Sequence, residues 1–157
     1  MAQPPPDSDA EMLIRQNYSG LRILVVDDEP INREVARLQL EAVDLVVDTA
    51  VNGEDAVMMA QKTAYAAILM DMQMPIMNGL EATKEIRNLP GYLDTQIIAM
   101  TANAFDEDKE LCVTAGMNEF LVKPFNPDSL FSNLLRCLDR NSELLGHDPV
   151  ATGEANT

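Results

Sequence analysis

The sequence predicts an α/β fold in which a five-stranded parallel sheet is covered by helices on both faces. Five short apolar segments recur along the chain, and each is followed by a segment whose apolar residues have helical spacing. The first of them, residues 21–26, is apolar and rich in β-branched side chains, as a strand buried on both faces should be. Parallel strands need crossover connections, and the intervening helices supply them.

The first helix begins at Pro30, a residue that the first helical turn tolerates because the N–H there has no intrahelical partner. Ile31, Val35 and Leu38 then recur at helical spacing. Residues 45–47 are apolar and β-branched, and they form the second predicted strand.

Asn52 is placed to cap the second helix, and the charges of Glu54 and Asp55 favour its N-terminus. Residues 66–70 form the third predicted strand. A turn and helix start follow at residues 78–79, for which a local explanation suffices and no chemistry is assigned. The buried side of that helix is predicted from the spacing of its apolar residues, which are Ala82, Ile86 and Leu89.

Residues 95–100 form the fourth predicted strand, and a helix from about Phe105 ends near Gly116, a plausible C-cap. Residues 119–122 are the fifth strand. The last helix starts near Pro127, and one stripe of leucines marks its buried side: Leu130, Leu134 and Leu138.

The chain is organised as one domain, residues 21–140, between two polar ends. Residues 1–20 and 141–157 are predicted to be flexible tails, because their proline-rich and polar composition buries too little surface to offset ordering entropy. The net charge is −15, of which the two ends carry −2 and −3. The remaining −10 therefore belongs to the predicted domain.

Composition excludes several classes of function. A chain this acidic repels phosphate backbones, so we expect no direct nucleic-acid binding. No apolar run approaches the ~20 residues of a membrane helix, and the N-terminus lacks the features of a secretory signal. Cys112 and Cys137 form no C-x-x-C pair, and the single histidine, His147, has no partners for a zinc site. These features favour a reducing, cytoplasmic setting and no membrane contact.

Chemistry-bearing residues follow four of the predicted strands. Ligands of open parallel sheets bind outside the carboxyl ends of the strands, so residues just beyond those ends can meet. They are Asp27 and Asp28 after the first strand, Asp71 after the third, Thr101 after the fourth and Lys123 after the fifth.

The negative charges of three carboxylates that lie close together require positive charge to offset their repulsion. Two unit charges about 4 Å apart cost roughly 4 kcal/mol at an effective dielectric near 20. Lys123 supplies one positive charge, and Mg²⁺, a hard ion that prefers oxygen ligands and keeps several waters, would supply the rest. An aspartate beside Mg²⁺ and a lysine is the requirement for phosphoryl transfer through an acyl phosphate, with Thr101 as a hydrogen-bond donor to the phosphoryl group.

The strand-end residues lie in a set of five longer motifs, which are Leu24-Val25-Val26-Asp27-Asp28-Glu29-Pro30, Met70-Asp71-Met72-Gln73-Met74-Pro75-Ile76-Met77-Asn78-Gly79, Leu80-Glu81-Ala82-Thr83, Met100-Thr101-Ala102 and Phe120-Leu121-Val122-Lys123-Pro124-Phe125. In these motifs the sequence resembles the response-regulator receiver domain, the CheY-like family. The resemblance covers roughly residues 21–140 and is closest to receivers of hybrid sensor histidine kinases. It implies a flavodoxin-like (βα)5 topology with strand order 2-1-3-4-5.

The resemblance also implies residue roles. Asp71 would accept a phosphoryl group from a histidine kinase or a phosphotransfer protein. Asp28 and Asp71 would ligate Mg²⁺ directly, Gln73 through its backbone carbonyl and Asp27 through water. Lys123 would hold a phosphoryl oxygen and the Asp71 carboxylate.

Switching is implied as well. Thr101 would move toward the phosphoryl group and Phe120 inward behind it, changing the surface formed by the helix from about residue 105, strand 119–122 and the last helix. A homodimer through that surface and a cis Lys123–Pro124 bond are further expectations from the family. Phosphoryl lifetime would be tuned near Gln73 and Asn103.

Two other functions are compatible with parts of the pattern. A Mg²⁺-dependent phosphatase of the haloacid-dehalogenase type also uses an aspartyl nucleophile, but residues 27–31 lack its second spaced aspartate. A binding module that no longer reacts would keep the fold, although Asp28, Asp71, Thr101 and Lys123 are all present. The domain itself is not expected to turn over an independent substrate. The chain would be either a stand-alone receiver or part of a larger hybrid kinase.

Overall fold

The computed structural model contains a single sheet of five parallel strands in the order β2-β1-β3-β4-β5. It describes residues 6–72, 74, 77–92, 95–101, 106–123 and 126–144, with the backbone alone at 6–9, 106–109 and 141–144. The strands are β1 (Arg22–Val26), β2 (Val46–Ala50), β3 (Ala67–Asp71), β4 (Gln96–Thr101) and β5 (Glu119–Val122). The predicted fold class and the implied strand order are both confirmed.

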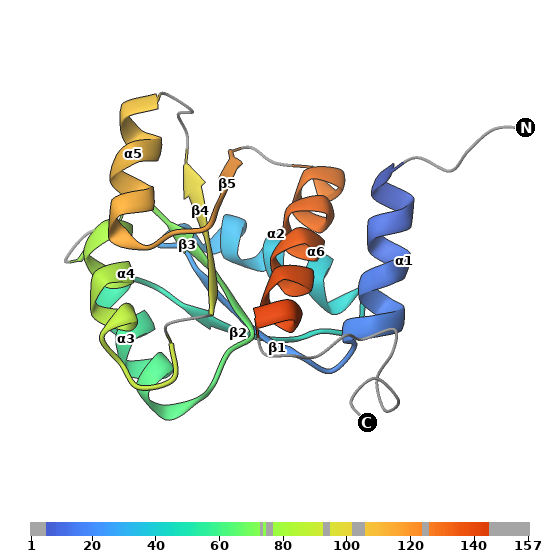
Figure 1. Cartoon of the computed structure of the whole chain (residues 1–157), viewed down its shortest axis with the longest axis horizontal. Coiled ribbons are helices and arrows are strands. Elements are labelled where there is room, and N and C mark those ends of the chain that lie inside the picture. The colour runs from blue at the N-terminus through green and yellow to red at the C-terminus, as the bar shows by residue number, and fades with distance from the viewer. Residues whose placement is uncertain are drawn as a thin grey trace, which may run out of the picture.

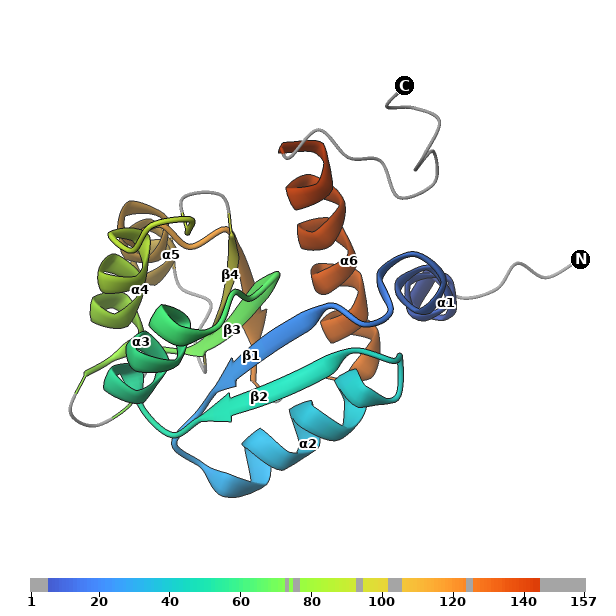
Figure 2. The ribbon, with the colours of Figure 1, turned by 90° about the horizontal axis from the view of Figure 1, so that it is seen from below.

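Helices cover both faces of the sheet (Figures 1 and 2). On one side lie α3, α4 and α5, and on the other lie α2 and α6, with α1 packed outside α6. The helices are α1 (Pro6–Tyr18), α2 (Pro30–Glu41), α3 (Gly53–Lys62), α4 (Gly79–Arg87), α5 (Asp106–Ala115) and α6 (Pro127–Leu144). None of the helices in the described part of the chain is both long and apolar enough to cross a membrane.

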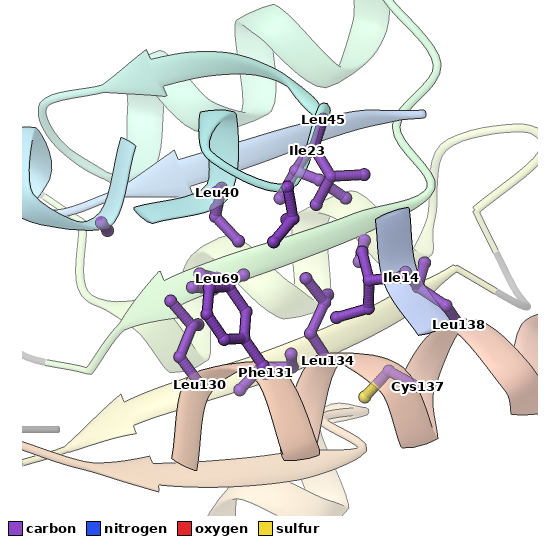
Figure 3. Close-up of a cluster of buried hydrophobic side chains, with 14 of the residues drawn as sticks. Ile14, Ile23, Leu40, Leu45, Leu69, Leu130, Phe131, Leu134, Cys137 and Leu138 are labelled. Carbon is purple, nitrogen blue, oxygen red and sulfur yellow. The ribbon is translucent and has the colours of Figure 1, made fainter. Parts of the chain in front are cut away.

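Alternate residues of the central strands pack into two separate hydrophobic cores, one on each face of the sheet. Ile23 and Leu69 point toward α2 and α6, whereas Leu24 and Ile68 point toward α3, α4 and α5. All five residues of β3 are buried, because β3 is flanked by β1 and β4 and covered on both faces. Figure 3 shows the first core, where Leu40 of α2 and the leucine stripe of α6 meet over β1 and β3.

Local sequence signals mark the helix ends correctly. The Asn52 side chain accepts a hydrogen bond from the Asp55 N–H and so caps α3, and Pro30 is the first residue of α2. Gly116 follows α5 with φ of 112°, a conformation that glycine adopts without a steric penalty. Cys112 and Cys137 are buried helix residues, as expected.

The buried side of α2 differs from a simple reading of its apolar spacing. Ile31, Val35 and Leu38 are 72%, 44% and 54% exposed, and the helix buries Ala36 and Leu40 instead. The spacing therefore predicts the helix correctly but not the face that packs on the sheet. An apolar stripe remains on the outer surface of α2.

Both predicted tails contain helix. Residues 6–18 form α1, whose Ala10, Ile14 and Tyr18 are buried against α6 and the sheet. Composition suggested an unstructured segment because this end is rich in proline and polar residues, but Ala10, Ile14 and Tyr18 recur at intervals of four and form one helical face. At the other end, α6 continues to Leu144, past the predicted boundary at residue 140. His147 and the rest of that end lie outside the described residues.

Ion pairs connect the edge strand β5 to α6. The Glu119 carboxylate accepts hydrogen bonds from Arg136 at 3.2 Å and Arg140 at 2.7 Å, and Arg140 also donates to Gln96 on β4. Burial tends to raise the pKa of Glu119, but the hydrogen bonds from the two arginines outweigh it and hold that pKa below the usual range.

We predict that Glu119→Gln lowers the free energy of unfolding at pH 7 by about 1 kcal/mol. Because the folded-state pKa is lowered, this contribution is complete above the ordinary glutamate pKa and is lost as the pH falls through the folded value. Urea unfolding of both chains at pH 7 and pH 3 measures it. A difference between the chains that is equally large at pH 3 would contradict the ionic origin of the contact.

Candidate functional site

Strand register brings four chain segments to one edge of the sheet. Val26 of β1 pairs with Met70 of β3, and Asp71 pairs with Met100 of β4. Thr101 pairs with Val122 of β5, and the Lys123 N–H donates to the Thr101 carbonyl at 2.7 Å. The C-terminal ends of β1, β3, β4 and β5 therefore lie together at one edge of the sheet.

The Lys123 ammonium lies between two buried carboxylates. Its Nζ is 3.1 Å from Oδ2 of Asp27 and 3.0 Å from Oδ1 of Asp71. Asp27 and Asp71 are only 1% and 4% exposed. A single cation thus bridges two carboxylates that would otherwise repel each other in a poorly solvated position.

Asp28 completes the acidic group from the solvent side. Carboxylate oxygens of Asp27, Asp28 and Asp71 all lie within 4.8 Å of one another, and Asp28 is the exposed member. They border an open pocket of about 150 Å³. The residues lining it are Asp27, Asp28, Glu29, Asn32, Asp71, Met72, Thr101 and Lys123.

The loop after β1 is held by its own backbone hydrogen bonds and by α2. Oδ1 of Asp27 accepts from the Glu29 N–H at 2.9 Å, and Arg33 donates to the Asp27 carbonyl at 2.8 Å. The Glu29 carboxylate caps α2 by accepting from the Ile31 N–H. Sequence reasoning missed these supporting roles of Glu29 and Arg33, although their positions at the N-cap and in the first turn of the helix that follows the acidic pair were a usable signal.

Electrostatics keep Lys123 charged. Burial tends to lower the pKa of Lys123, but its hydrogen bonds with Asp71 and Asp27 outweigh that effect and raise the pKa above its usual value. The ammonium is therefore permanently available at neutral pH as a fixed positive charge beside the Asp71 carboxylate.

The remaining predicted residues are distributed as follows. Thr101, at the end of β4, is half-buried and lines the pocket. Phe120 is partly buried on β5 and packs against the core between the sheet and α3, α4 and α5. Gln73, Asn103 and Pro124 lie outside the described residues, so the backbone ligand, the lifetime-tuning position and the cis bond stay expectations.

Gly79 has a structural role that a local turn reading overlooked. A Cβ atom built at Gly79 would lie 2.3 Å from the carbonyl oxygen of Asp71 and 3.0 Å from the Cα of Met72. The Gly79 N–H also donates to the Met72 carbonyl at 3.2 Å. Asn78 caps α4 in a reciprocal pair with Glu81. The absent side chain of Gly79 lets α4 approach the backbone of the residue that ends β3.

The donor set fits a hard divalent cation. Three carboxylates converge within 4.8 Å, one of them faces solvent, and the donor group contains neither sulfur nor imidazole. Mg²⁺ is bound in proteins through one or two carboxylates while it keeps several waters, which suits a small open pocket.

Comparison with known proteins identifies the family. The family model described as "Response regulator receiver domain" matches residues 23–135. The two-component response regulator ORR41 of Oryza sativa subsp. japonica is 42% identical over 114 residues, which covers 70% of this chain and 88% of that protein. The sensor histidine kinase RcsC of Salmonella typhi is 40% identical over 133 residues, which covers 85% of this chain and 13% of that protein.

Solved structures agree with this result. The receiver domain of the sensor histidine kinase PA1611 from Pseudomonas aeruginosa, with magnesium coordinated in its active-site cleft, is 40% identical with a TM-score of 0.68, over 78% of this chain and 97% of that one. The chemotaxis protein CheY4 of Vibrio cholerae is 34% identical with a TM-score of 0.74, over 76% of this chain and 100% of that one.

The fold and the acidic site define a phosphoacceptor module of two-component signalling. The chain belongs to the response regulator receiver domain family and is homologous to receivers of hybrid histidine kinases. Proteins of this family interact with histidine kinases or phosphotransfer proteins. The chain spans only 15% of the probable histidine kinase 1 of Oryza sativa subsp. indica.

We predict that Gly79→Ala destabilises the fold by about 1–3 kcal/mol because the new methyl group collides with the Asp71 carbonyl. At a compatible helical position the same change would stabilise by about 0.4–1 kcal/mol, so the sign of the effect is diagnostic. Chemical unfolding measures it, with Asn78→Ala as the control that removes only the cap. A Gly79→Ala chain more stable than the parent would refute the close approach.

Proposed function

We propose that Asp71 is the phosphoacceptor of this receiver. The observation that carries the proposal is the position of its carboxylate, 3.0 Å from the Lys123 ammonium and within 4.8 Å of Asp27 and Asp28, at an open pocket. A phosphoryl group attached there adds roughly 1.5–2 negative charges, and it would stand beside a lysine that stays protonated.

The chemistry is a transfer between two covalent bonds. An Asp71 carboxylate oxygen attacks the phosphorus of a phosphohistidine, an acyl phosphate bond forms, and the phosphorus–nitrogen bond breaks with its electron pair on the imidazole. Lys123 neutralises the charge on a phosphoryl oxygen, and the Thr101 hydroxyl donates a hydrogen bond to another. The Asp27 side chain positions Lys123 from the opposite side, because it accepts the second hydrogen bond of the ammonium.

Mg²⁺ would be held by Asp28 and Asp71 directly, by Asp27 through water and by the backbone carbonyl of Gln73. When bound, the ion supplies positive charge that neutralises phosphoryl oxygens during transfer. The support for this assignment is the all-oxygen donor set of the described residues.

Phosphorylation would then switch the surface of α5, β5 and α6 through Thr101 and Phe120. Thr101 lies at the pocket at the end of β4, and Phe120 lies on the neighbouring strand β5 and packs against the core covered by α3, α4 and α5. A homodimer through this surface belongs to the same proposal, and it is supported by the exposed apolar side chains of Leu111 on α5 and Val122 on β5.

The phosphoryl donor would dock on α2. Its exposed stripe of Ile31, Val35 and Leu38 starts beside the pocket, since Glu29 and Asn32 line the pocket on either side of Ile31. Apolar side chains at i, i+4 and i+7 suit a helical partner. The proposed donor is therefore a helical phosphohistidine protein, either a histidine kinase or a phosphotransfer protein.

We predict that the parent chain is labelled by acetyl phosphate in the presence of Mg²⁺ and that Asp71→Asn is labelled only at background level. Mass spectrometry of the intact protein measures the incorporation. Glu85→Gln, which removes one charge from the exposed surface of α4, is the control and should be labelled like the parent. Equal labelling of Asp71→Asn and the parent would refute the assignment.

Two further assays, hydrolysis of a phosphate ester and stability with and without Mg²⁺, discriminate the two alternatives. Continuous hydrolysis of a generic phosphate ester would favour the aspartyl phosphatase. Absence of both labelling and any Mg²⁺ effect on stability would favour a module that binds partners without phosphorylation.

We predict that Val35→Asp slows phosphotransfer from a phosphorylated phosphotransfer protein by about tenfold, equivalent to ~1.4 kcal/mol of docking, because a charge interrupts the apolar stripe. Labelling by acetyl phosphate should not change, since the small donor needs no docking surface. Met58→Asp, on an exposed position of α3, is the matched control. If both variants accept the group from the protein donor as fast as the parent does, α2 is not the docking surface.

A further inference from the structure

We propose that the outer side of α6, together with the C-terminal end of α2, is a helix-docking surface that α1 fills in cis. Helix α1 lies outside the residues that the receiver family model matches, which begin at residue 23. CheY4 of Vibrio cholerae aligns over its whole length with only 76% of this chain. The helix is therefore an addition to a domain whose five strands and five following helices are already complete.

Apolar packing along one face of α1 makes the contact. Ala10, Ile14 and Tyr18 are 3%, 0% and 6% exposed, whereas Met12 on the opposite side of the helix is 50% exposed. Figure 3 shows Ile14 reaching from α1 toward Leu134 and Leu138 of α6. Full burial of an isoleucine side chain contributes more free energy of stabilisation than most single contacts do. Ile14 is therefore the main apolar contact of this interface.

Polar contacts fix the orientation of α1 at its C-terminal end. The Tyr18 hydroxyl donates to Oδ1 of Asp139 on α6. Arg15 donates to the carbonyl of Ala42, the C-cap of α2, at 2.8 Å, and the Gly20 N–H donates to the Asp44 carbonyl at 2.7 Å. The helix is thus attached to both α6 and the end of α2, and these contacts specify one register rather than a loose apolar association.

The docking surface is separate from the phosphoacceptor pocket. Among the described residues, none from α1 lines that pocket. Its polar partners Ala42 and Asp44 follow α2, and Asp139 lies in the second half of α6, so they are separate from the strand ends that form the pocket. Two consequences follow. The folded unit includes residues 6–18, and another protein can use this side of α6 only after α1 has left it.

Substitution combined with a peptide in trans tests the proposal. In the full chain, Ile14→Asp should undock α1 and lower the thermal unfolding midpoint by about 5–15 °C. The matched control Met12→Asp, on the exposed side of the same helix, should stay within about 1 °C of the parent. A synthetic peptide of residues 1–20 should then raise the midpoint of the Ile14→Asp chain, because a ligand that binds only the folded form stabilises it. It should not affect the parent, whose surface is already occupied.

The remaining outcomes are also decisive. A peptide that itself carries Ile14→Asp should have no effect. Association of the Ile14→Asp chain into a dimer that the parent peptide dissociates supports the surface, with a second copy as its occupant. If Ile14→Asp does not fold, Ile14→Ala replaces it in the same comparison. A midpoint equal to that of Met12→Asp, or no response to the peptide, would overturn the proposal.

Discussion

The ammonium of Lys123 between Asp27 and Asp71 is the interaction on which the site depends. Two carboxylates with at most 4% exposure repel each other in a poorly solvated position, and the Lys123 ammonium, 3.1 Å from one and 3.0 Å from the other, offsets that repulsion. Removal of the lysine would leave a buried charge without a partner. The free-energy cost of that charge is larger than the stabilisation that the intact ion pair provides. The same bridge holds a positive charge beside the Asp71 carboxylate, and Asp28 lies on the exposed side of the group.

The fold is arranged around this constraint. Parallel register brings the ends of β1, β3, β4 and β5 together, so charges far apart in the sequence meet at one edge of the sheet. Backbone contacts then fix each side chain. The Glu29 N–H and the Arg33 side chain hold the Asp27 loop, and the missing side chain of Gly79 lets α4 pack on the backbone of Asp71. Thr101 and Phe120 lie on the neighbouring strands β4 and β5.

Sequence reasoning succeeded where local rules and charge placement decide the structure. Strand composition, the Asn52 cap, the Pro30 start and the Gly116 end each follow from backbone chemistry, and the strand-end rule brought Asp27, Asp28, Asp71 and Lys123 together. It failed where tertiary packing decides. The spacing of Ile31 and Val35 does not tell which helix face meets the sheet. The segment of α1 buries Ile14 against α6, a contact that depends on a residue far away in the sequence. The need for glycine at position 79 depends on an approach between segments eight residues apart, which no local pattern records.

The acidic group of Asp27, Asp28 and Asp71 is proposed to bind a hard divalent cation beside Lys123. The most direct test is the thermal unfolding midpoint of the protein measured against MgCl₂ concentration, with ionic strength held constant by NaCl. We expect a saturable rise of the midpoint in the parent chain, since a ligand that binds only the folded state stabilises it, and a much weaker rise in Asp28→Asn. A midpoint that does not change with Mg²⁺, or an equal rise in both chains, would contradict it.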